Sequence, residues 1–584
     1  MKKRVTLSKA YLWVLKNLFT PKAKKLSIAL IVLLNIGLVI HMAQALVIGR
    51  VFELLKEITA WESLLWQLPL LYVALWVVSQ YFDHLKSKIE INLWFDTYRS
   101  VNQGIFANLN RRSPFQLTSQ EEIFGQSAMA RFRSAVHRVK DTILFIAASE
   151  FMAMLIAQCF LFWFNWPVAL IMCGYIVIAF FWASRSNIAT ARDGRELEKD
   201  FRKADRQRDV RLDHMSMMIH ADMAQRDEKE WLSEVEEMRN KHKKMWFRYE
   251  RHLFARNVLG IVIAGAAFLV TFDQYLSGTL SFAMLYPTIV WSRQVWDKTW
   301  RFANVDRVLQ KIGLTIIEGV EAMLTPVTIQ DPEEGIVPGD TDNLSIEFEN
   351  VTFGHGSDEP ILNNVSFTIH YGDKYGIVGP TGAGKSTLLR LIRGDVLPQK
   401  GRVLVNGVPT SKLKLNWWRR YWQYCAQDPR PYPDELGRVA TYLCGPDSLP
   451  DEETLVQLLK RVRLDDLLRH KDGLKRKILN KGDDLSGGQK QRLMFLMAIL
   501  DNPKMLMLDE PTSSLDSDTE QVLTSLLKDF PTVLVVAHRL GTVSDGYKIM
   551  VLEGGNVKLF PNLKSATSSS EFVAKCAGLQ QVAA

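Results

Sequence analysis

Long apolar runs punctuate the first half of the chain. Residues 26–48 contain no lysine, arginine, aspartate or glutamate, and an apolar run of this length crosses a lipid bilayer as a helix. Later runs are separated only by the Trp166-Pro167 junction and by the short segment 273–278, which we expect to form turns between helices. We therefore predict six membrane-spanning helices, at about residues 26–48, 64–84, 142–165, 167–185, 255–272 and 279–300.

The positions of the basic residues predict an orientation in the membrane. Lysine and arginine are frequent before residue 26 and in the stretches 86–140 and 185–256, whereas the segments 166–167 and 273–278 have none. By the positive-inside rule, both termini and both long stretches are cytoplasmic. Helical spacing of apolar residues over 7–19 predicts a helix along the inner surface. We expect a multi-pass protein of the bacterial cytoplasmic (inner) membrane.

The long basic stretches themselves have a helical pattern. Residues 227–251 are rich in good helix formers, with opposite charges three and four positions apart. We therefore expect helices that extend from the membrane into the cytoplasm.

The pattern changes after residue 325. Residues 326–343 are rich in proline, glycine and acidic residues and read as a linker, and from residue 344 short β-type runs alternate with helical stretches. This alternation is typical of an α/β domain with a largely parallel sheet. The predicted organisation is an α-helical membrane domain over 1–325, the linker, and an α/β domain over 344–584.

A glycine-rich loop lies between an apolar strand and a helix in the sequence KYGIVGPTGAGKSTLLRLI, which is the context of a P-loop. Its glycines let backbone N–H groups approach phosphate oxygens. Lys385 is expected to reach the β- and γ-phosphates of ATP, and the Ser386 hydroxyl to ligate Mg²⁺. The predicted ATP-binding residues of this loop are Gly379, Thr381, Gly382, Ala383, Gly384, Lys385, Ser386 and Thr387.

Two carboxylates end the apolar run MLMLDE. Asp509 is placed to hold Mg²⁺ through its water shell, and Glu510 to act as the general base on the attacking water. His538 follows another apolar strand, and Gln427 lies in YCAQDP. Taken alone, each of these two residues is compatible with a functional role and equally with a structural role.

A second anion-binding pattern occurs downstream. Leu485-Ser486-Gly487-Gly488-Gln489 runs into a helix-like segment, and such a helix start binds anions. One chain thus has two candidate phosphate sites.

These motifs together resemble those of ATP-binding cassette (ABC) transporters, in the order GPTGAGKST, Gln427, LSGGQKQR, MLMLDEPTSSLD and VVAHRL. The resemblance covers residues 344–560, and six preceding spans resemble an exporter-type half-transporter. It implies that Gln427 senses Mg²⁺ and the attacking water, that Asp516 lies at a dimer seam, and that His538 contacts the γ-phosphate. Coupling helices are implied near 122–129 and 214–221.

The resemblance also implies whose phosphate the second pattern binds. Ser486 and Gly488, with Gly487 and Gln489, would close over the ATP held by Lys385 of a partner. The expected assembly is a homodimer, or a dimer with a related half-transporter. ATP and Mg²⁺ are the implied cofactors.

Three positions depart from the family pattern. His355 stands where an aromatic residue usually stacks on adenine, residues 478–482 lack the usual Gly-Glu pair, and Met497 replaces a common arginine. None belongs to the hydrolysis set, so we expect an active ATPase. His355 is either a stacking residue or a surface-loop residue.

The sequence says less about what is moved. Glu150 lies inside an apolar run and is either a pathway residue or a structural partner of a neighbouring helix. His41, Gln44 and Trp291 are further candidates for a pathway, Trp291 alternatively marking the inner interface. We expect an exporter or flippase of lipophilic, lipid-like or peptide substrates in contact with membrane lipids. The alternatives are an importer on the same fold and a nucleotide-gated regulator that does not pump.

Composition adds two exclusions. The net charge of +9 would allow a nucleic-acid partner, but the predicted spans exclude a soluble nucleic-acid-linked ATPase. The five cysteines show neither zinc-site nor disulfide spacing, which fits a reducing compartment for the C-terminal half.

Overall fold

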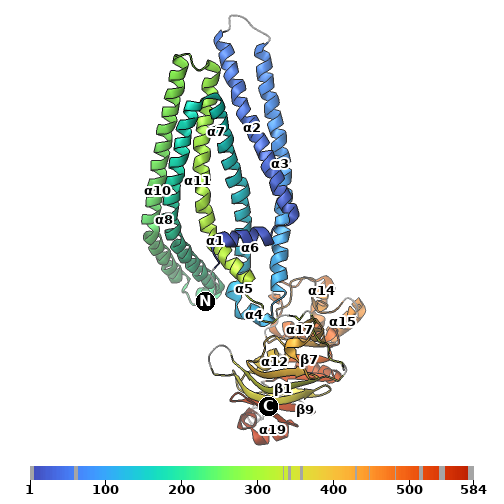
Figure 1. The fold of residues 1–584 in the computed structure, drawn as a ribbon. Helices are drawn as coiled ribbons and strands as arrows, with labels where there is room; N and C mark the ends of the chain where they lie inside the picture. The colour runs from blue at the N-terminus through green and yellow to red at the C-terminus, as the bar shows by residue number, and fades with distance from the viewer. Residues whose placement is uncertain are drawn as a thin grey trace. The chain divides into compact units, whose positions relative to one another are not determined.

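The computed structural model describes residues 5–57, 64–329, 331–332, 334–339, 343–354, 359–427, 430–445, 448–479, 482–511, 517–537, 543 and 546–576. The chain forms two compact units (Figure 1). The helical unit comprises Met1–Leu109 and Gln120–Thr325, and the nucleotide unit comprises Asn110–Ser119 and Pro326–Ala584.

The helical unit is built from long helices and several short ones. In chain order they are α1 (Leu7–Asn17), α2 (Pro21–Glu57), α3 (Leu64–Leu109), α5 (Glu121–Phe124), α6 (Gln126–Asp141), the π-helix η1 (Thr142–Ala148), α7 (Ser149–Phe164), α8 (Trp166–Asp213), α9 (Met215–His220), α10 (Ala224–Leu276) and α11 (Phe282–Leu324). The helix predicted over 7–19 is observed as α1, and its place along the membrane surface stays a prediction.

Among the described residues, four helical segments are long and apolar enough to cross a membrane. They are Pro21–Leu55, Glu121–Phe164, Trp166–Ser186 and Ala224–Leu276. The other two predicted spans fall in α3, which contacts α2, and in α11, which contacts α2, α7 and α8. The helical architecture expected from the apolar runs is thus confirmed.

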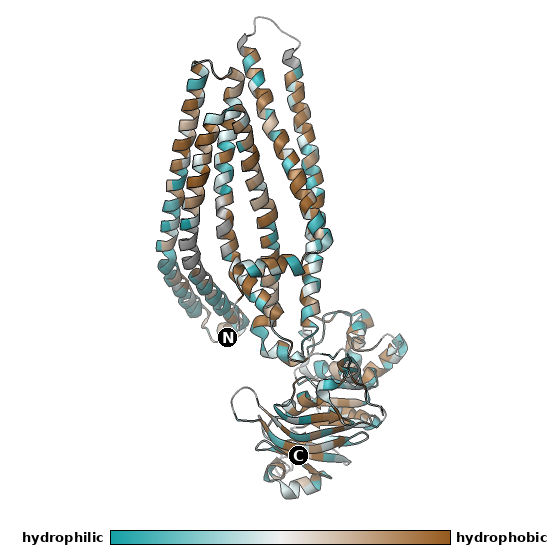
Figure 2. Cartoon of the chain, viewed as in Figure 1, coloured by the Kyte–Doolittle hydropathy of each residue, from teal (hydrophilic) through white to brown (hydrophobic). Residues whose placement is uncertain are grey.

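The long basic stretches are helical, as predicted. Because α8 and α10 continue without a break, each span and its charged extension form one rod, and the two rods contact each other. Hydrophobic residues colour the upper parts of the long helices brown in Figure 2, whereas the lower ends of α8 and α10 are mostly teal. The turn between α7 and α8 is held by Asn165, whose Nδ2 donates to Oε1 of Gln274 at 2.8 Å.

The nucleotide unit contains two sheets rather than the single sheet that the sequence suggested. A four-stranded antiparallel sheet has the order β2-β1-β4-β5, from Leu362–His370, Ser345–Phe353, Lys400–Val405 and Val408–Pro409. A six-stranded sheet has the order β10-β9-β3-β8-β7-β6, from Asn556–Phe560, Tyr547–Glu553, Lys374–Val378, Thr532–Val536, Met505–Asp509 and Trp422–Cys425. Its strands are parallel except for the antiparallel edge pair β9 and β10.

Helices cover both faces of the six-stranded sheet. The helices of this unit are α4 (Pro114–Ser119), α12 (Lys385–Arg393), α13 (Leu415–Tyr421), α14 (Leu436–Ala440), α15 (Glu452–Arg461), α16 (Asp465–Leu468), α17 (Gly487–Leu500), α18 (Ser517–Leu526) and α19 (Leu563–Ser569).

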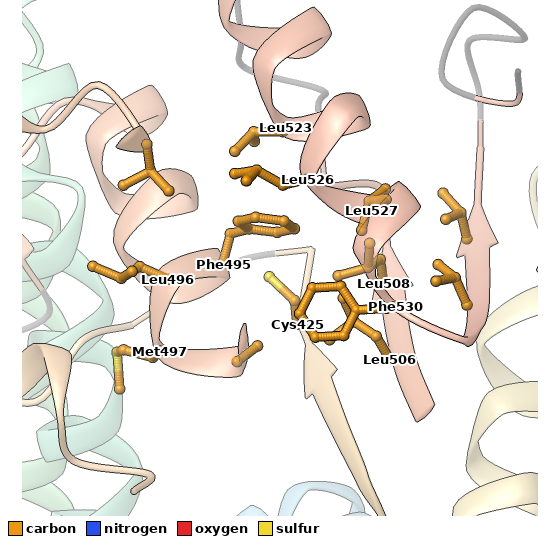
Figure 3. Packing of buried hydrophobic residues seen from close by; sticks show 14 of the residues in the cluster. Cys425, Phe495, Leu496, Met497, Leu506, Leu508, Leu523, Leu526, Leu527 and Phe530 are labelled. Carbon is orange, nitrogen blue, oxygen red and sulfur yellow. The ribbon is translucent and has the colours of Figure 1, made fainter. Parts of the chain in front are cut away.

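Alternating residues of the buried strands point into two different hydrophobic cores. In β7, Met505 and Met507 join the core that contains α12 and the antiparallel sheet, whereas Leu506 and Leu508 join the core that contains α17 and α18. Figure 3 shows the second core, where Met497 lies beside Leu496 and Phe495. The arginine common at position 497 is thus replaced by a methionine that is 3 % exposed and fills apolar space.

The segment read as a linker lies along the nucleotide unit. The backbone of Ile336 exchanges hydrogen bonds with Lys412 and Lys414 at 2.9 and 3.0 Å, and Asp331 accepts from the N–H of Leu415 at 2.8 Å. This segment is therefore attached to the nucleotide unit by one isolated parallel bridge, between Ile336 and Leu413, and by the side chain of Asp331.

Residues 110–119, which belong to the first long basic stretch, are part of the nucleotide unit. Nε2 of Gln116, in α4, donates to the carbonyl of Pro326 at 2.9 Å, and Oε1 accepts from the N–H of Thr328 at 3.3 Å. The guanidinium of Arg390 lies 5.2 Å from the ring centre of Phe115. Segment 122–129, the first expected coupling helix, lies instead in α5 and α6 of the helical unit.

Candidate functional site

The P-loop joins β3 to α12. Gly382 and Gly384 have φ values of +84° and +95°, a left-handed backbone that glycine adopts without a Cβ penalty. A side chain at Gly379 would lie 2.3 Å from the carbonyl oxygen of Leu552, so glycine is required there for space. The exposed residues Thr381 and Gly382 form the tip of the loop. The loop thus presents backbone N–H groups at the positive end of a helix, which suits a phosphate.

Lys385 is the first residue of α12 and is buried. Its Nζ donates to the carbonyls of Gly379 and Pro380 at 2.8 and 3.0 Å, so the ammonium is folded over the loop. Burial lowers the pKa of Lys385, and the nearby carboxylates of Glu510 and Asp509 oppose this shift. A desolvated cation in a loop of N–H donors favours an anionic ligand.

Asp509 ends β7 and is 4 % exposed. Its Oδ2 accepts a hydrogen bond from Oγ of Ser386 at 2.9 Å. A hydroxyl beside a buried carboxylate is the oxygen ligand set that Mg²⁺ prefers, so the chemistry of these two residues fits the implied metal. Thr387, the next residue in α12, is buried.

Glu510 follows directly in a left-handed conformation, with φ of +52°, which is costly for a residue with a Cβ. Its N–H donates to the carbonyl of Val536 at 3.1 Å, which ties the turn to β8. This turn gives the two consecutive carboxylates different surroundings. Oε2 of Glu510 accepts from Nε2 of the exposed Gln427 at 2.7 Å.

The second anion-binding pattern begins α17, as expected from the sequence. Ser486 is the N-cap of α17, and its Oγ accepts from the N–H of Gln489 at 3.2 Å while Oε1 of Gln489 accepts from the N–H of Ser486 at 2.9 Å. This reciprocal capping box leaves the first N–H groups, those of Gly487 and Gly488, at the helix start. Nε2 of Gln489 donates to Asp466. Ser486 and Gly487 are exposed.

The two candidate phosphate sites of one chain lie on helices from opposite faces of the sheet. Apolar residues of α12, such as Leu388, belong to one core, and those of α17, such as Leu493, belong to the other. The helix starts of Lys385 and Ser486 therefore belong to different layers of the unit.

Three predicted site residues lie outside the described part of the chain: His355, Asp516 and His538. Their roles stay predictions.

Two residues that the sequence reasoning missed lie beside Asp509. Oη of Tyr424 donates to Oδ2 of Asp509 at 3.2 Å, and the guanidinium of Arg393 lies 3.8 Å from the ring centre of Tyr424. Arg393 forms a buried ion pair with Asp395. Burial and the charge of Asp509 raise the pKa of Tyr424 to about 12, so the phenol is a stable donor. No local motif marks these positions.

Glu150 is paired with basic residues of α11. Its Oε2 lies 2.9 Å from Nζ of Lys298, and its Oε1 lies 3.7 Å from Nη1 of Arg301. The carboxylate is 12 % exposed. This arrangement favours the structural-partner interpretation of Glu150.

Of the other pathway candidates, Trp291 and Gln44 are buried in the helical unit, whereas His41 is exposed. Trp291 is fully buried, and its Nε1 donates to the carbonyl of Met42 at 3.3 Å. The rings of Phe160 and Phe164 pack against it, with centroids 5.1 and 5.4 Å away. His41 and Gln44 contact each other within α2 at 3.1 Å.

Comparison with known proteins places these features in a family. Residues 362–513 match the family described as ABC transporter. The chain is 37 % identical to a mitochondrial iron-sulfur clusters transporter, ATM1 of Kluyveromyces lactis, over 240 residues, which are 40 % of this chain and 33 % of that protein. It is 30 % identical to the multidrug resistance-like ATP-binding protein MdlA of Escherichia coli over 303 residues, which are 51 % of this chain and 49 % of MdlA. The matches thus span half or less of these relatives.

A solved structure covers nearly the whole chain. The structure of a bacterial Atm1-family ABC exporter with ATP bound matches with a TM-score of 0.78 over 96 % of this chain and 99 % of that one, at 22 % identity. At this identity the likeness establishes the fold. Residues 362–513 therefore match an ABC transporter domain, and the whole chain has the fold of an ABC exporter, with a helical domain and a nucleotide-binding domain in one polypeptide.

Proposed function

We propose that two copies of this chain form an ATP-driven exporter that moves amphipathic, lipid-like or peptide cargo across a bacterial cytoplasmic membrane. The observation that carries the proposal is the arrangement of Lys385, Ser386, Asp509 and Glu510 at one end of the parallel sheet, in a chain that also has helices long and apolar enough to cross a membrane. The names of the relatives include iron-sulfur cluster, multidrug and exotoxin transport, so they support transport without specifying one cargo.

Each residue of the site has a distinct role in ATP hydrolysis. The P-loop N–H groups and Lys385 bind and orient the phosphates. Ser386 and Asp509 would hold Mg²⁺, which supplies charge neutralisation at the phosphate oxygens when it is bound. Glu510 accepts a proton from the water that attacks the γ-phosphorus, while the bond to the β–γ bridging oxygen breaks. Gln427, hydrogen-bonded to Glu510, orients that carboxylate.

The second anion site belongs to the same reaction in a partner copy. Because α12 and α17 cover opposite faces of the sheet, Ser486 and the N–H groups of Gly487 and Gly488 are proposed to close over ATP bound at the partner's Lys385. ATP would thus hold two copies together, and hydrolysis would release them.

A mixed dimer tests this arrangement. A Lys385→Ala copy and a Ser486→Arg copy are co-expressed with different tags and purified through both tags. If each site uses two chains, one site of the mixed dimer carries both changes and the other carries neither, so ATPase activity returns that neither variant has alone. A mixed dimer as inactive as its parents would contradict the shared site.

Transport direction needs a separate measurement. In inside-out vesicles, an exporter accumulates cargo when ATP is added, and Glu510→Gln vesicles provide the inactive control. ATP-dependent loss of preloaded cargo would instead identify an importer.

A further inference from the structure

A cavity of about 540 Å³ lies at the surface of the helical unit, where its lining residues Ile91 and Trp94 are 57 % and 45 % exposed. Leu34 of α2, Ile91 and Trp94 of α3, and Phe145 of η1 provide its apolar lining. A cavity of this size accommodates a small organic ligand rather than a few waters.

The cavity lies where two helices change from apolar to charged sequence. The predicted span of α3 ends at about residue 84, and the cavity residues of α3 begin at Lys86. Charged α6 ends at Asp141, and the apolar π-helix η1 begins at Thr142. In a membrane helix, a change from apolar to charged sequence corresponds to the boundary between the hydrocarbon core and the polar region of the bilayer. An amphipathic molecule resides at this boundary.

Two ion pairs complete the lining, one on each helix. Nζ of Lys86 lies 3.7 Å from Oε1 of Glu90, and Nζ of Lys140 lies 3.3 Å from Oδ1 of Asp141. Lys140 is 1 % exposed, which is unusual for a lysine because an ammonium group is costly to remove from water. The lining thus has two positive and two negative groups and no net charge.

Two further features mark this region as more than a packing gap. The wall includes part of η1, a seven-residue π-helix, and π-helical segments occur frequently at functional sites. One turn before Lys140, the His137 ring packs against Trp94 and Tyr98, with centroids 6.1 and 5.9 Å away. Among the described residues, neither ring nitrogen of His137 has a hydrogen-bond partner, although both are buried.

We propose that this cavity binds amphipathic zwitterions, with their ammonium group toward Glu90 and Asp141 and their acidic group toward Lys86 and Lys140. A purely anionic head group would meet the two carboxylates, and a purely cationic one the two lysines, whereas a zwitterion complements both ion pairs. The apolar body of the ligand lies against Ile91, Trp94 and the other apolar lining residues.

This inference rests on the proposed export function and names a cargo class for it. Aminophospholipids and apolar peptides with free termini share this chemistry.

Binding to the full-length protein tests the site directly. The protein is placed in phosphatidylglycerol nanodiscs, and two probes are added: phosphatidylethanolamine, and the tripeptide Leu-Phe-Leu with either free or blocked termini. We expect the free peptide or phosphatidylethanolamine to bind and to stimulate ATP hydrolysis, and the blocked peptide to do neither. Response to the lipid alone or to the peptide alone identifies the source of the zwitterion. Equal binding of free and blocked peptides, without binding of phosphatidylethanolamine, overturns the proposal.

Matched variants locate the binding. The double variant Lys86→Gln/Glu90→Gln is expected to raise the dissociation constant about tenfold, which corresponds to about 1.4 kcal/mol. The control Glu236→Gln/Arg239→Gln neutralises an exposed ion pair on α10 and should leave the dissociation constant unchanged. Trp94→Ala should also weaken binding, whereas Trp163→Ala, at an 85 % exposed tryptophan of α7, should not. Wild-type affinity in the Lys86/Glu90 variant overturns the site.

Transport and binding separate the two proposals. If the Lys86→Gln/Glu90→Gln variant moves the probe with ATP as fast as the wild type does, the cavity proposal is overturned and the export function stands. Cavity-dependent binding without ATP-driven movement supports the cavity and contradicts the export function.

Discussion

Tyr424 and Ser386 donate hydrogen bonds to the same oxygen of Asp509, Oδ2, at 3.2 and 2.9 Å. Ser386 comes from the P-loop helix and Tyr424 from β6, so two elements fix one carboxylate. A serine that ligates Mg²⁺ orients its oxygen toward the metal, whereas the phenol remains free to hold Asp509. We therefore predict that Tyr424 positions the carboxylate of Asp509, which is proposed to hold Mg²⁺.

Tyr424→Phe removes this hydrogen bond and keeps the ring against Arg393. We expect the Mg²⁺ concentration for half-maximal ATPase activity to rise about fivefold, which corresponds to the loss of about 1 kcal/mol. The affinity for ATP without metal should not change, because the P-loop is unaltered. Mn²⁺ binding, followed by electron paramagnetic resonance, gives a readout independent of turnover.

The control for Tyr424→Phe is Tyr442→Phe, which alters an exposed tyrosine stacked on Tyr432. An unchanged Mg²⁺ requirement in Tyr424→Phe would show that Ser386 alone positions Asp509.

Glu510→Gln tests the general base. Turnover is expected to fall at least about a hundredfold, because an amide does not accept the proton of the attacking water. ATP binding should persist, since Lys385 and the P-loop are unaltered, and ATP should trap the dimer, which size-exclusion chromatography detects. Normal hydrolysis by this variant would assign the base to another residue.

Tyr547 predicts a stability change at alkaline pH. Burial raises the pKa of this 4 % exposed tyrosine to about 12, so the folded chain keeps the phenol neutral after the unfolded chain has ionised. Its stabilising contribution is therefore present below pH 10 and is lost between about pH 10 and pH 12. The unfolding free energy should fall by about 1 kcal/mol by pH 11 through this group.

The difference between wild type and Tyr547→Phe isolates this contribution from the titration of lysines. Urea unfolding at several pH values measures it. A pH-independent difference would exclude a raised pKa at Tyr547.

Glu150→Gln tests whether the carboxylate is structural. The change leaves Lys298 without its counter-charge, whereas the half-exposed Arg301 still pairs with Asp297, and we expect a loss of about 1–2 kcal/mol of stability. Lys298→Gln should cost a similar amount, and the double variant less than the sum, because neither charge is then left alone. Thermal melts in detergent measure the cycle.

The half-saturating cargo concentration provides the complementary readout. It should stay unchanged in Glu150→Gln. Strictly additive melting shifts together with weaker cargo stimulation would instead place Glu150 in the transport pathway.

Much of the nucleotide unit could be predicted from local sequence. Buried parallel strands are continuous apolar runs, so Met505–Asp509 and Thr532–Val536 were recognisable, and the helix start at Ser486 follows from its capping residues. The assignment of β1 and β2 to a separate antiparallel sheet was missed, because partner choice depends on pairing across long sequence separations.

The role of Tyr424 was missed for a related reason. Its contact with Asp509 depends on the parallel register of β6 and β7, in which Tyr424 pairs with Met507. No neighbouring residue in the sequence encodes that register. Likewise, the ion pair of Glu150 joins residues about 150 positions apart, so an apolar context alone left two interpretations open.

The unbroken course of α10 has a mechanical consequence. Its 53 residues form one helix, which at 1.5 Å per residue is about 80 Å long. A tilt of about 5° at one end therefore displaces the other end by about 7 Å. Because α10 is continuous, a small tilt at its apolar end would be transmitted along its whole length to its charged end.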